Sequence, residues 1–238
     1  MVEERLYRRT VSGGNLIAYE VKLEQTDLFV GTDHNLYDIT LDLVYKYRNY
    51  IENYIKLVPE FLTSLHPLDN DPLAPKIIQD MLFFSRMAGV GPMAAVAGAM
   101  AQYVGTDLCR FSQNVIIENG GDNYINLQKA ALVSIHAGKS PLSEKIVLKI
   151  EADRMPLGVC TSSGTIGHSL SSGRADAVCV MAESAVLADA AATALGNQVK
   201  DRNSIEKVLE NGMRISGVKG IVIIFGETMG ACGDVVLA

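Results

Sequence analysis

Residues 184–195 read Ser-Ala-Val-Leu-Ala-Asp-Ala-Ala-Ala-Thr-Ala-Leu and predict a helix of small and apolar residues with Ser184 as its N-cap. Asp189 and Thr193 are four positions apart, so both project from one face of this helix. A carboxylate and a hydroxyl at that spacing supply two hard oxygen ligands for Mg²⁺, which water, carbonyl groups or ligand phosphates would complete. The alternative is that Asp189 lies in solvent or accepts from a backbone amide while Thr193 bonds back to the helix. The residues alone favour this alternative.

Strands and helices occur in separate blocks on either side of this helix. Apolar residues at helical spacing predict a long helix over residues 36–63, bent near Pro59, and a shorter one over 76–87 that ends at Gly89. An N-terminal hairpin is expected around residues 13–15. Because strands and helices do not alternate throughout, the pattern predicts an α+β fold in a single domain over residues 1–238. Further strands are expected at 28–30, 114–118, 124–127, 131–135, 146–151, around Val159, 175–181 and 220–225. The helix that carries Asp189 is expected to extend over 185–198, and a further helix over 204–213.

Residues 87–106 carry no charged side chain and are long enough to cross a bilayer. The segment is built largely from Ala and Gly, contains Pro92 and Gln102, and lacks the Leu, Ile and Phe density that favours membrane insertion. We therefore expect a buried Ala/Gly-rich helix, with Pro92 in its first turn, and no membrane span.

The composition narrows the classes of partner. With 238 residues, 48% hydrophobic and 20% charged, the chain can bury a full core. The net charge of −6 and the scattered Lys and Arg argue against a nucleic-acid partner, which favours a small molecule or a protein. Charges in residues 1–5 leave no apolar signal core, and the four cysteines show no zinc spacing, so we expect a cytoplasmic protein. The abundant Ala and Met leave room for a homo-oligomer.

A glycine pair and a helix start offer places for a phosphate-bearing ligand. Gly120 and Gly121 follow a predicted strand, so backbone can approach a ligand where a Cβ would collide, and Asp122 would project from the turn. An ordinary hairpin loop is the alternative and is favoured on this evidence alone. Gly91 precedes a helix N-terminus, where free amides favour a phosphate, although a tight helix-to-helix connection explains it better.

A second loop offers hydroxyl groups. Thr161, Ser162, Ser163 and Gly164 follow a predicted strand and suit an anion held by hydroxyl and amide donors, although such loops are also common without ligands. His168 lies just beyond and is the leading acid/base candidate; a solvated loop histidine is equally compatible with the sequence.

These motifs, in this order, resemble the ApbE superfamily, whose best-known members are Mg²⁺-dependent FAD:protein FMN transferases. Residues 119–122 (Asn-Gly-Gly-Asp) resemble that family's Gly-Gly-Asp turn, residues 161–164 its Thr-Ser-Gly loop, and residues 188–195 its metal-binding helix. The resemblance implies mixed or antiparallel sheets packed with helices. It also implies that Asp189 and Thr193 hold Mg²⁺, and that FAD or another nucleotide contacts Gly91, Gly120, Gly121, Asp122, Thr161, Ser162, Ser163 and Gly164.

The amino-acid sequence at residues 84–98, 118–122 and 161–169 is similar to that of a narrower, uncharacterised ApbE-like family of archaea and anaerobic bacteria. That family is associated with homocysteine biosynthesis and sulfur assimilation, which implies a protein partner in sulfur metabolism. Two parts of the transferase pattern are missing: residues 94–97 contain no lysine, and a short segment at 167–173 replaces His-x-x-Asp-Pro-x-Thr-Gly. The resemblance therefore allows an enzyme of the transferase type, FMN transfer itself, or a non-catalytic accessory protein.

Overall fold

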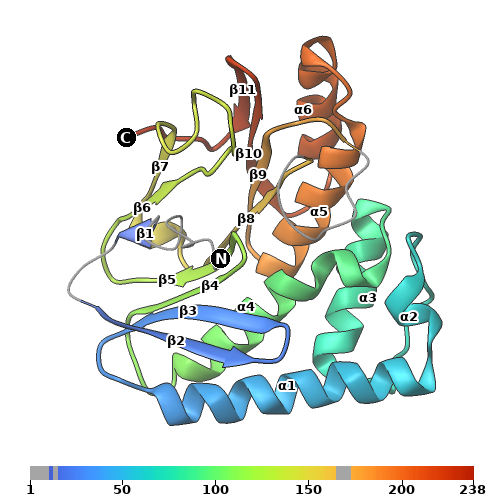
Figure 1. Ribbon diagram of the computed structural model, residues 1–238, viewed down its shortest axis with the longest axis vertical. Coiled ribbons are helices and arrows are strands. Elements are labelled where there is room, and N and C mark those ends of the chain that lie inside the picture. Colours follow the sequence, from blue (N-terminus) through green and yellow to red (C-terminus); the bar gives the residue numbers. More distant parts are fainter. Residues whose placement is uncertain (1–10, 13–15, 165–172) are drawn as a thin grey trace.

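A computed structural model describes residues 11–12, 16–164 and 173–238. The expected α+β fold is confirmed, and every strand pair in both sheets is antiparallel. The larger sheet has eight strands in the order β11-β10-β9-β8-β5-β4-β3-β2, and the smaller has three in the order β1-β6-β7 (Figure 1). The strands are β1 (Val11–Ser12), β2 (Ile17–Leu23), β3 (Thr26–Thr32), β4 (Val115–Asn119), β5 (Asp122–Asn126), β6 (Ala131–Ser134), β7 (Val147–Ile150), β8 (Leu157–Ser162), β9 (Ala177–Ala182), β10 (Val218–Phe225) and β11 (Thr228–Gly233).

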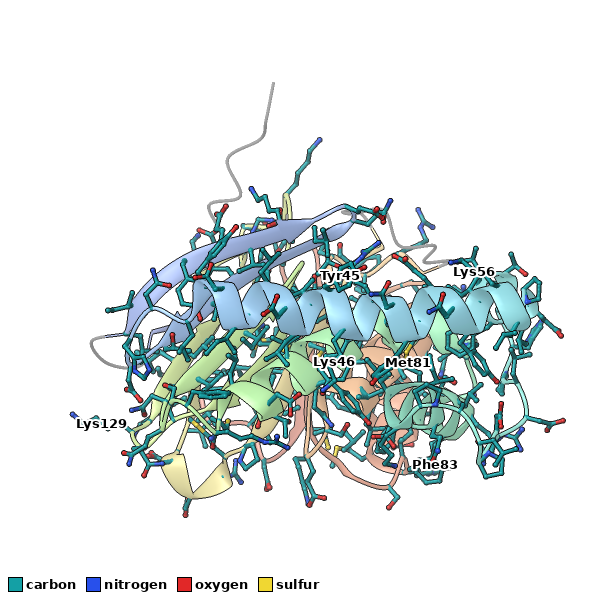
Figure 2. All side chains as sticks on the ribbon, turned by 90° about the horizontal axis from the view of Figure 1, so that it is seen from below. Tyr45, Lys46, Lys56, Met81, Phe83 and Lys129 are labelled. Carbon is teal, nitrogen blue, oxygen red and sulfur yellow. The ribbon has the colours of Figure 1, made fainter. Side chains whose placement is uncertain are left out.

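The helices cover one face of the large sheet. Helix α5 packs on β8 and β9, α4 on β4 and β5, α1 on β2, and α6 on β10 and β11. Figure 2 shows α1 lying lengthwise across this layer in front of α4. The α-helices are α1 (Tyr37–Leu57), α2 (Glu60–Thr63), α3 (Lys76–Ala88), α4 (Val96–Leu108), α5 (Ala185–Gln198) and α6 (Ile205–Met213).

The large sheet separates two apolar cores. One core lies between the helices and the sheet and includes Val30, Ile117 and Leu195. The second lies on the opposite face, where Ile116, Ile125 and Val159 pack against residues of β6 and β7. Since side chains alternate along a strand, neighbouring residues of β4 and β5 contribute to different cores. This alternation decides which polar residues face the helices.

The uncharged segment is interrupted at the glycines that were expected to begin and end helices. Gly89 takes a left-handed conformation (φ +77°) that ends α3, and a 3₁₀ turn at Pro92–Ala95 leads into α4. Helix α4 is largely buried, as expected. No single helix among the described residues is long and apolar enough to span a membrane; α3 and residues 92–108 meet that test only together, with a bend of 103°.

The N-terminal hairpin lies elsewhere than the sequence suggested. Strand β1 pairs with β6 in the small sheet, whereas β2 pairs with β3 through a turn at Glu24 and Gln25. The expectation of a hairpin around residues 13–15 was therefore wrong. Alternation of apolar and polar residues identifies strands but does not identify their partners.

Candidate functional site

The candidate site lies where α5 meets the start of α4, the β4–β5 turn and β8. Two glycines allow this close approach. A Cβ on Gly98 of α4 would lie 2.2 Å from the carbonyl oxygen of Ala185, and a Cβ on Gly158 of β8 would lie 2.3 Å from the Cα of Ala185. Because both obstacles are backbone atoms, neither could move aside as a side chain tip does. Helix α5 is therefore wedged against α4 and the sheet.

Asp189 is buried within this contact, with 9% of its surface exposed. Its Oδ2 accepts a hydrogen bond from the Gly98 amide at 2.8 Å, and the Ala97 amide also donates to the carboxylate. Helix α4 has no side-chain cap of its own, so a carboxylate from α5 satisfies amides of its first turn. Burial raises the pKa of Asp189 to about 7, although the Gly98 and Ala97 amides oppose the shift.

Asp122 approaches the same region from β5, where it lies opposite Cys160 of β8. It is 8% exposed, and burial, followed by the nearby charge of Asp189, raises its pKa well above the ordinary value. Neither carboxyl group forms an ion pair with any residue that the structure describes. Two acids from separate elements therefore share a buried environment without a described cationic partner.

Cys160 is the thiol of this site. It is fully buried, hydrogen-bonds to Asp122, and its Sγ lies 3.4 Å from the Ala185 carbonyl oxygen. Burial, together with the charges of Asp122 and Asp189, raises its pKa well above the ordinary value. The group is therefore held as a thiol and is unsuited to act as a nucleophile.

Thr193 lies one turn beyond Asp189 on α5 and is half-buried. Its hydroxyl makes no hydrogen bond with a described residue, so the back-bond to the helix considered from the sequence does not occur there. The backbone-amide partner considered for Asp189 does occur. The structure thus places the Asp189 carboxylate in a structural contact with α4. The Thr193 hydroxyl has no such contact among the described residues.

The Gly-Gly turn is a two-residue hairpin connection, as expected. Gly120 and Gly121 have φ of +69° and +107°, values that glycine adopts without strain and that suit the twist of a tight hairpin. The Asn119 side-chain amide donates to the carbonyl oxygen of Ala97 at 3.1 Å, which ties this turn to the first turn of α4. The turn, α4 and Asp189 therefore form one connected unit.

The hydroxyl loop begins on β8, whose strand ends at Ser162. The Thr161 side chain is hydrogen-bonded to Cys179 on the sheet face away from α5. The next two residues, Ser162 and Ser163, are half-buried. The Gly164 amide donates to the Ala175 carbonyl oxygen at 3.0 Å, which brings the two described ends of the loop together. His168 lies outside the described residues.

Gly91 is explained by packing. A Cβ there would lie 1.8 Å from the carbonyl oxygen of Ser64, so glycine is required for the chain to pass. Its contact with a ligand stays a prediction, as do those of Gly120, Gly121, Thr161 and Gly164.

Sequence reasoning did not single out two buried polar residues beside the Gly-Gly turn, Glu118 and Asn123. A carboxylate at the end of an otherwise apolar strand was the available signal. The described residues contain no group of three or more His, Cys, Asp or Glu side chains arranged around one point. A cation at Asp189 would therefore need ligands from Thr193, backbone, water or a bound molecule.

Two surface hollows lie on the helical layer, away from these acids. One, of about 400 Å³, lies between α3 and residues 70–72. The other, of about 250 Å³, is lined by residues of α1 and α4 that include Tyr47, Gln102 and Asp107. Gln102 also accepts from the Ala185 amide at 2.7 Å, which gives α4 a second contact with α5.

Comparison with known proteins agrees with the fold. A family model described as AbpE bacteria matches residues 8–229. The chain belongs to this ApbE-like family. It is 38% identical over 226 residues to a UPF0280 protein of Methanococcus aeolicus, covering 92% of this chain and 91% of that one. It is also 38% identical over 199 residues to a UPF0280 protein of Methanocaldococcus jannaschii, covering 82% and 81%.

Solved structures share the ApbE-like fold at low sequence identity. The apo form of the flavinyl transferase ApbE from Pseudomonas stutzeri matches with a TM-score of 0.59 and 12% identity, covering 92% of this chain and 94% of that one. The ApbE protein from Thermotoga maritima matches with a TM-score of 0.55 and 11% identity, covering 91% and 96%. At such identities the likeness establishes the ApbE-like fold and no more.

Proposed function

We propose that this ApbE-like protein binds a flavin or another nucleotide with the help of Mg²⁺, at the site around Asp122 and Asp189. One observation carries the proposal: two carboxyl groups from different elements are buried together, the charge of Asp189 raises the pKa of Asp122, and neither forms an ion pair with a described residue. Burying such charges is costly unless a cation or a proton compensates. A divalent cation would supply that compensation.

The described residues fit such a cation. Asp189 and Thr193 offer a carboxylate and a hydroxyl on one helix face, and the hydroxyl bonds to no residue that the structure describes. Bound Mg²⁺ would neutralise phosphate charge on the ligand. The exposed Gly120 and the half-buried Ser162 and Ser163 offer amide and hydroxyl donors to the ligand's phosphate groups. His168 remains the candidate for proton transfer.

Two functions are compatible with the family. The fold of the flavinyl transferases supports FMN transfer, whereas the absence of lysine in residues 94–97 argues against it. The second candidate is an accessory or cofactor-binding protein of anaerobic sulfur assimilation or homocysteine biosynthesis, with a protein partner in that pathway. The missing transferase segments favour this second candidate.

Calorimetric titration tests the binding proposal. FAD, FMN and ATP are titrated into the wild-type chain with Mg²⁺ and with EDTA, and we expect at least one to bind at least tenfold more tightly with Mg²⁺. Asp189→Asn retains an oxygen for the Gly98 amide but removes the charge, so it should abolish the Mg²⁺ effect. Asp107→Asn is the control, because Asp107 is a half-buried acid that already pairs with Lys46 at 3.0 Å. Identical titrations of wild type and Asp189→Asn would remove the metal role.

A second experiment separates the two candidates. Purified protein is incubated with FAD, Mg²⁺ and a threonine-containing acceptor protein, and covalent FMN is sought by mass spectrometry. Transfer would identify a transferase. Ligand binding without turnover, combined with co-purification of a sulfur-transfer enzyme, would identify an accessory protein.

A further inference from the structure

Two buried polar side chains hold the Gly-Gly turn from the sheet face opposite Asp189. Glu118 of β4 and Asn123 of β5 are cross-strand partners and are 2% and 4% exposed. Each lies two residues from an apolar neighbour, Ile116 or Ile125, and so its side chain is on the same sheet face. That face belongs to the core on the far side of the sheet. Asp122 and Asp189 lie toward the helices, so the turn stands between two sets of polar groups.

Each polar group of Gly121 is held by one of these side chains. The Gly121 amide donates to Glu118 Oε1 at 2.8 Å, and its carbonyl oxygen accepts from Asn123 Nδ2 at 3.2 Å. Asn123 Nδ2 also donates to the Val159 carbonyl oxygen at 3.1 Å, which fixes the turn to β8. Both donors of the Asn123 amide are thereby used, and its buried Oδ1 has no hydrogen-bond partner among the described residues.

This arrangement has a chemical consequence for the turn. Gly121 presents neither its amide nor its carbonyl oxygen to a ligand, because both are already bonded on the far side. Gly120 is exposed, and its peptide groups make no hydrogen bond with another described residue. The backbone of Gly120 is therefore what the turn can still offer, and the Gly120 carbonyl, which shares a trans peptide with the Gly121 amide, points away from Glu118.

We propose that Glu118 and Asn123 are positioning residues, a clamp that holds both polar groups of Gly121 on the far side of the sheet so that the turn presents the backbone of Gly120 to a phosphate-bearing ligand. The inference rests on the proposed nucleotide or flavin site. A buried carboxylate and a buried, unpartnered amide oxygen are expensive ways to stabilise a hairpin that two glycines already permit. Their presence is explained if the ligand requires one orientation of the turn.

The test combines two readouts on the full chain. Hydrogen exchange of the Gly121 amide, followed by NMR, reports the clamp directly and needs no ligand. Titration with MgATP and with FAD in Mg²⁺ reports ligand affinity. In Glu118→Ala we expect Gly121 exchange at least tenfold faster and ligand affinity at least tenfold weaker. Glu118→Gln keeps an acceptor oxygen, so both values should return to within about threefold of wild type.

Two further variants keep the test decisive. Asn123→Ala releases the carbonyl side of Gly121 and should weaken ligand binding similarly, so it carries the test if Glu118→Ala does not fold. Asp33→Ala is the control: this carboxylate accepts the Gln113 and Asn114 amides at the opposite end of β4. It should lower stability without changing ligand affinity.

The outcomes separate the clamp from the site. A folded Glu118→Ala or Asn123→Ala that binds like wild type overturns the positioning role, as does an equal loss of affinity in Asp33→Ala. If Glu118→Gln binds ligand weakly while its Gly121 amide is still protected from hydrogen exchange, the loss of affinity is due to the lost charge. That outcome also overturns the positioning role. If wild type binds neither ATP nor FAD, the proposed function fails, and the ligand role of the clamp fails with it.

Discussion

Replacing Gly98 with alanine should destabilise the protein, although helix propensity alone predicts that it stabilises. Alanine within a helix normally stabilises by about 1 kcal/mol relative to glycine. At Gly98 the new methyl would lie 2.2 Å from the Ala185 carbonyl oxygen and 2.8 Å from Asp189 Cβ. A carbon needs about 3.3 Å from such an oxygen, so α4 and α5 must separate by about 1 Å.

That separation removes a second interaction. The Gly98–Asp189 hydrogen bond, now 2.8 Å, would stretch to about 3.8 Å and no longer count as a bond. Overpacking costs about 1–3 kcal/mol, and a buried charged group that loses its donor costs a similar amount. After subtracting the gain in propensity, we expect Gly98→Ala to lower the free energy of unfolding by about 3 kcal/mol. For a chain of this length, Tm should fall by roughly 6–12 °C.

Urea denaturation followed by circular dichroism measures this change, with an unaltered m-value showing that the unfolded state is the same. Gly31→Ala is the matched control, since its new methyl would lie 3.2 Å from the flexible tip of Leu16. We expect it to cost less than about 1 kcal/mol. Equal or greater stability of Gly98→Ala would refute the close α4–α5 contact on which the site is built.

Three further outcomes follow from the same site. Without divalent cations, burial raises the pKa of Asp189 from 3.8 to about 7, so its contribution to stability is complete below about pH 4 and is lost as pH rises through 7. The difference in unfolding free energy between wild type and Asp189→Asn should therefore change across pH 4–7 in EDTA; a constant difference would contradict the shift. Mg²⁺ added at pH 8 should raise Tm of wild type and leave that of Asp189→Asn unchanged, and equal increases would count against the metal role. Iodoacetamide should alkylate the exposed Cys232 in the native protein but not the buried Cys160 and Cys179, as peptide mass spectrometry would show; rapid native labelling of Cys160 would disprove its burial.

Local patterns predicted most elements of the fold. The helix expected over 36–63 is α1 followed by α2, with the break at Pro59, because apolar spacing and proline act within a few residues. The Gly-Gly turn was correctly predicted as a hairpin, since two adjacent glycines suit a turn that needs positive φ. Strand β11, rich in small residues, was not predicted, because Thr228–Gly233 lacks the alternation that marks a strand.

The candidate site was only partly accessible from the sequence. Asp189 and Thr193 could be placed on one helix face because helical spacing is fixed. The capping of α4 by Asp189 joins residues 91 positions apart, and no local pattern reports such a contact. The clamp around Gly121 was missed for another reason: Glu118 and Asn123 look like ordinary turn-flanking residues until their burial is known.

The sequence by itself determined the α+β class and the main helices, because these depend on periodicity and local composition. Its motif residues, in their order, carried the resemblance to the ApbE-like family. Only the tertiary structure decided that Asp122, Cys160 and Asp189 are buried together, that Gly121 bonds to the side chains of Glu118 and Asn123, and that Gly91 serves packing. Burial, charge proximity and close backbone contact arise between elements distant in the chain. They are consequences of how β5, β8, α4 and α5 pack, and no single segment contains them.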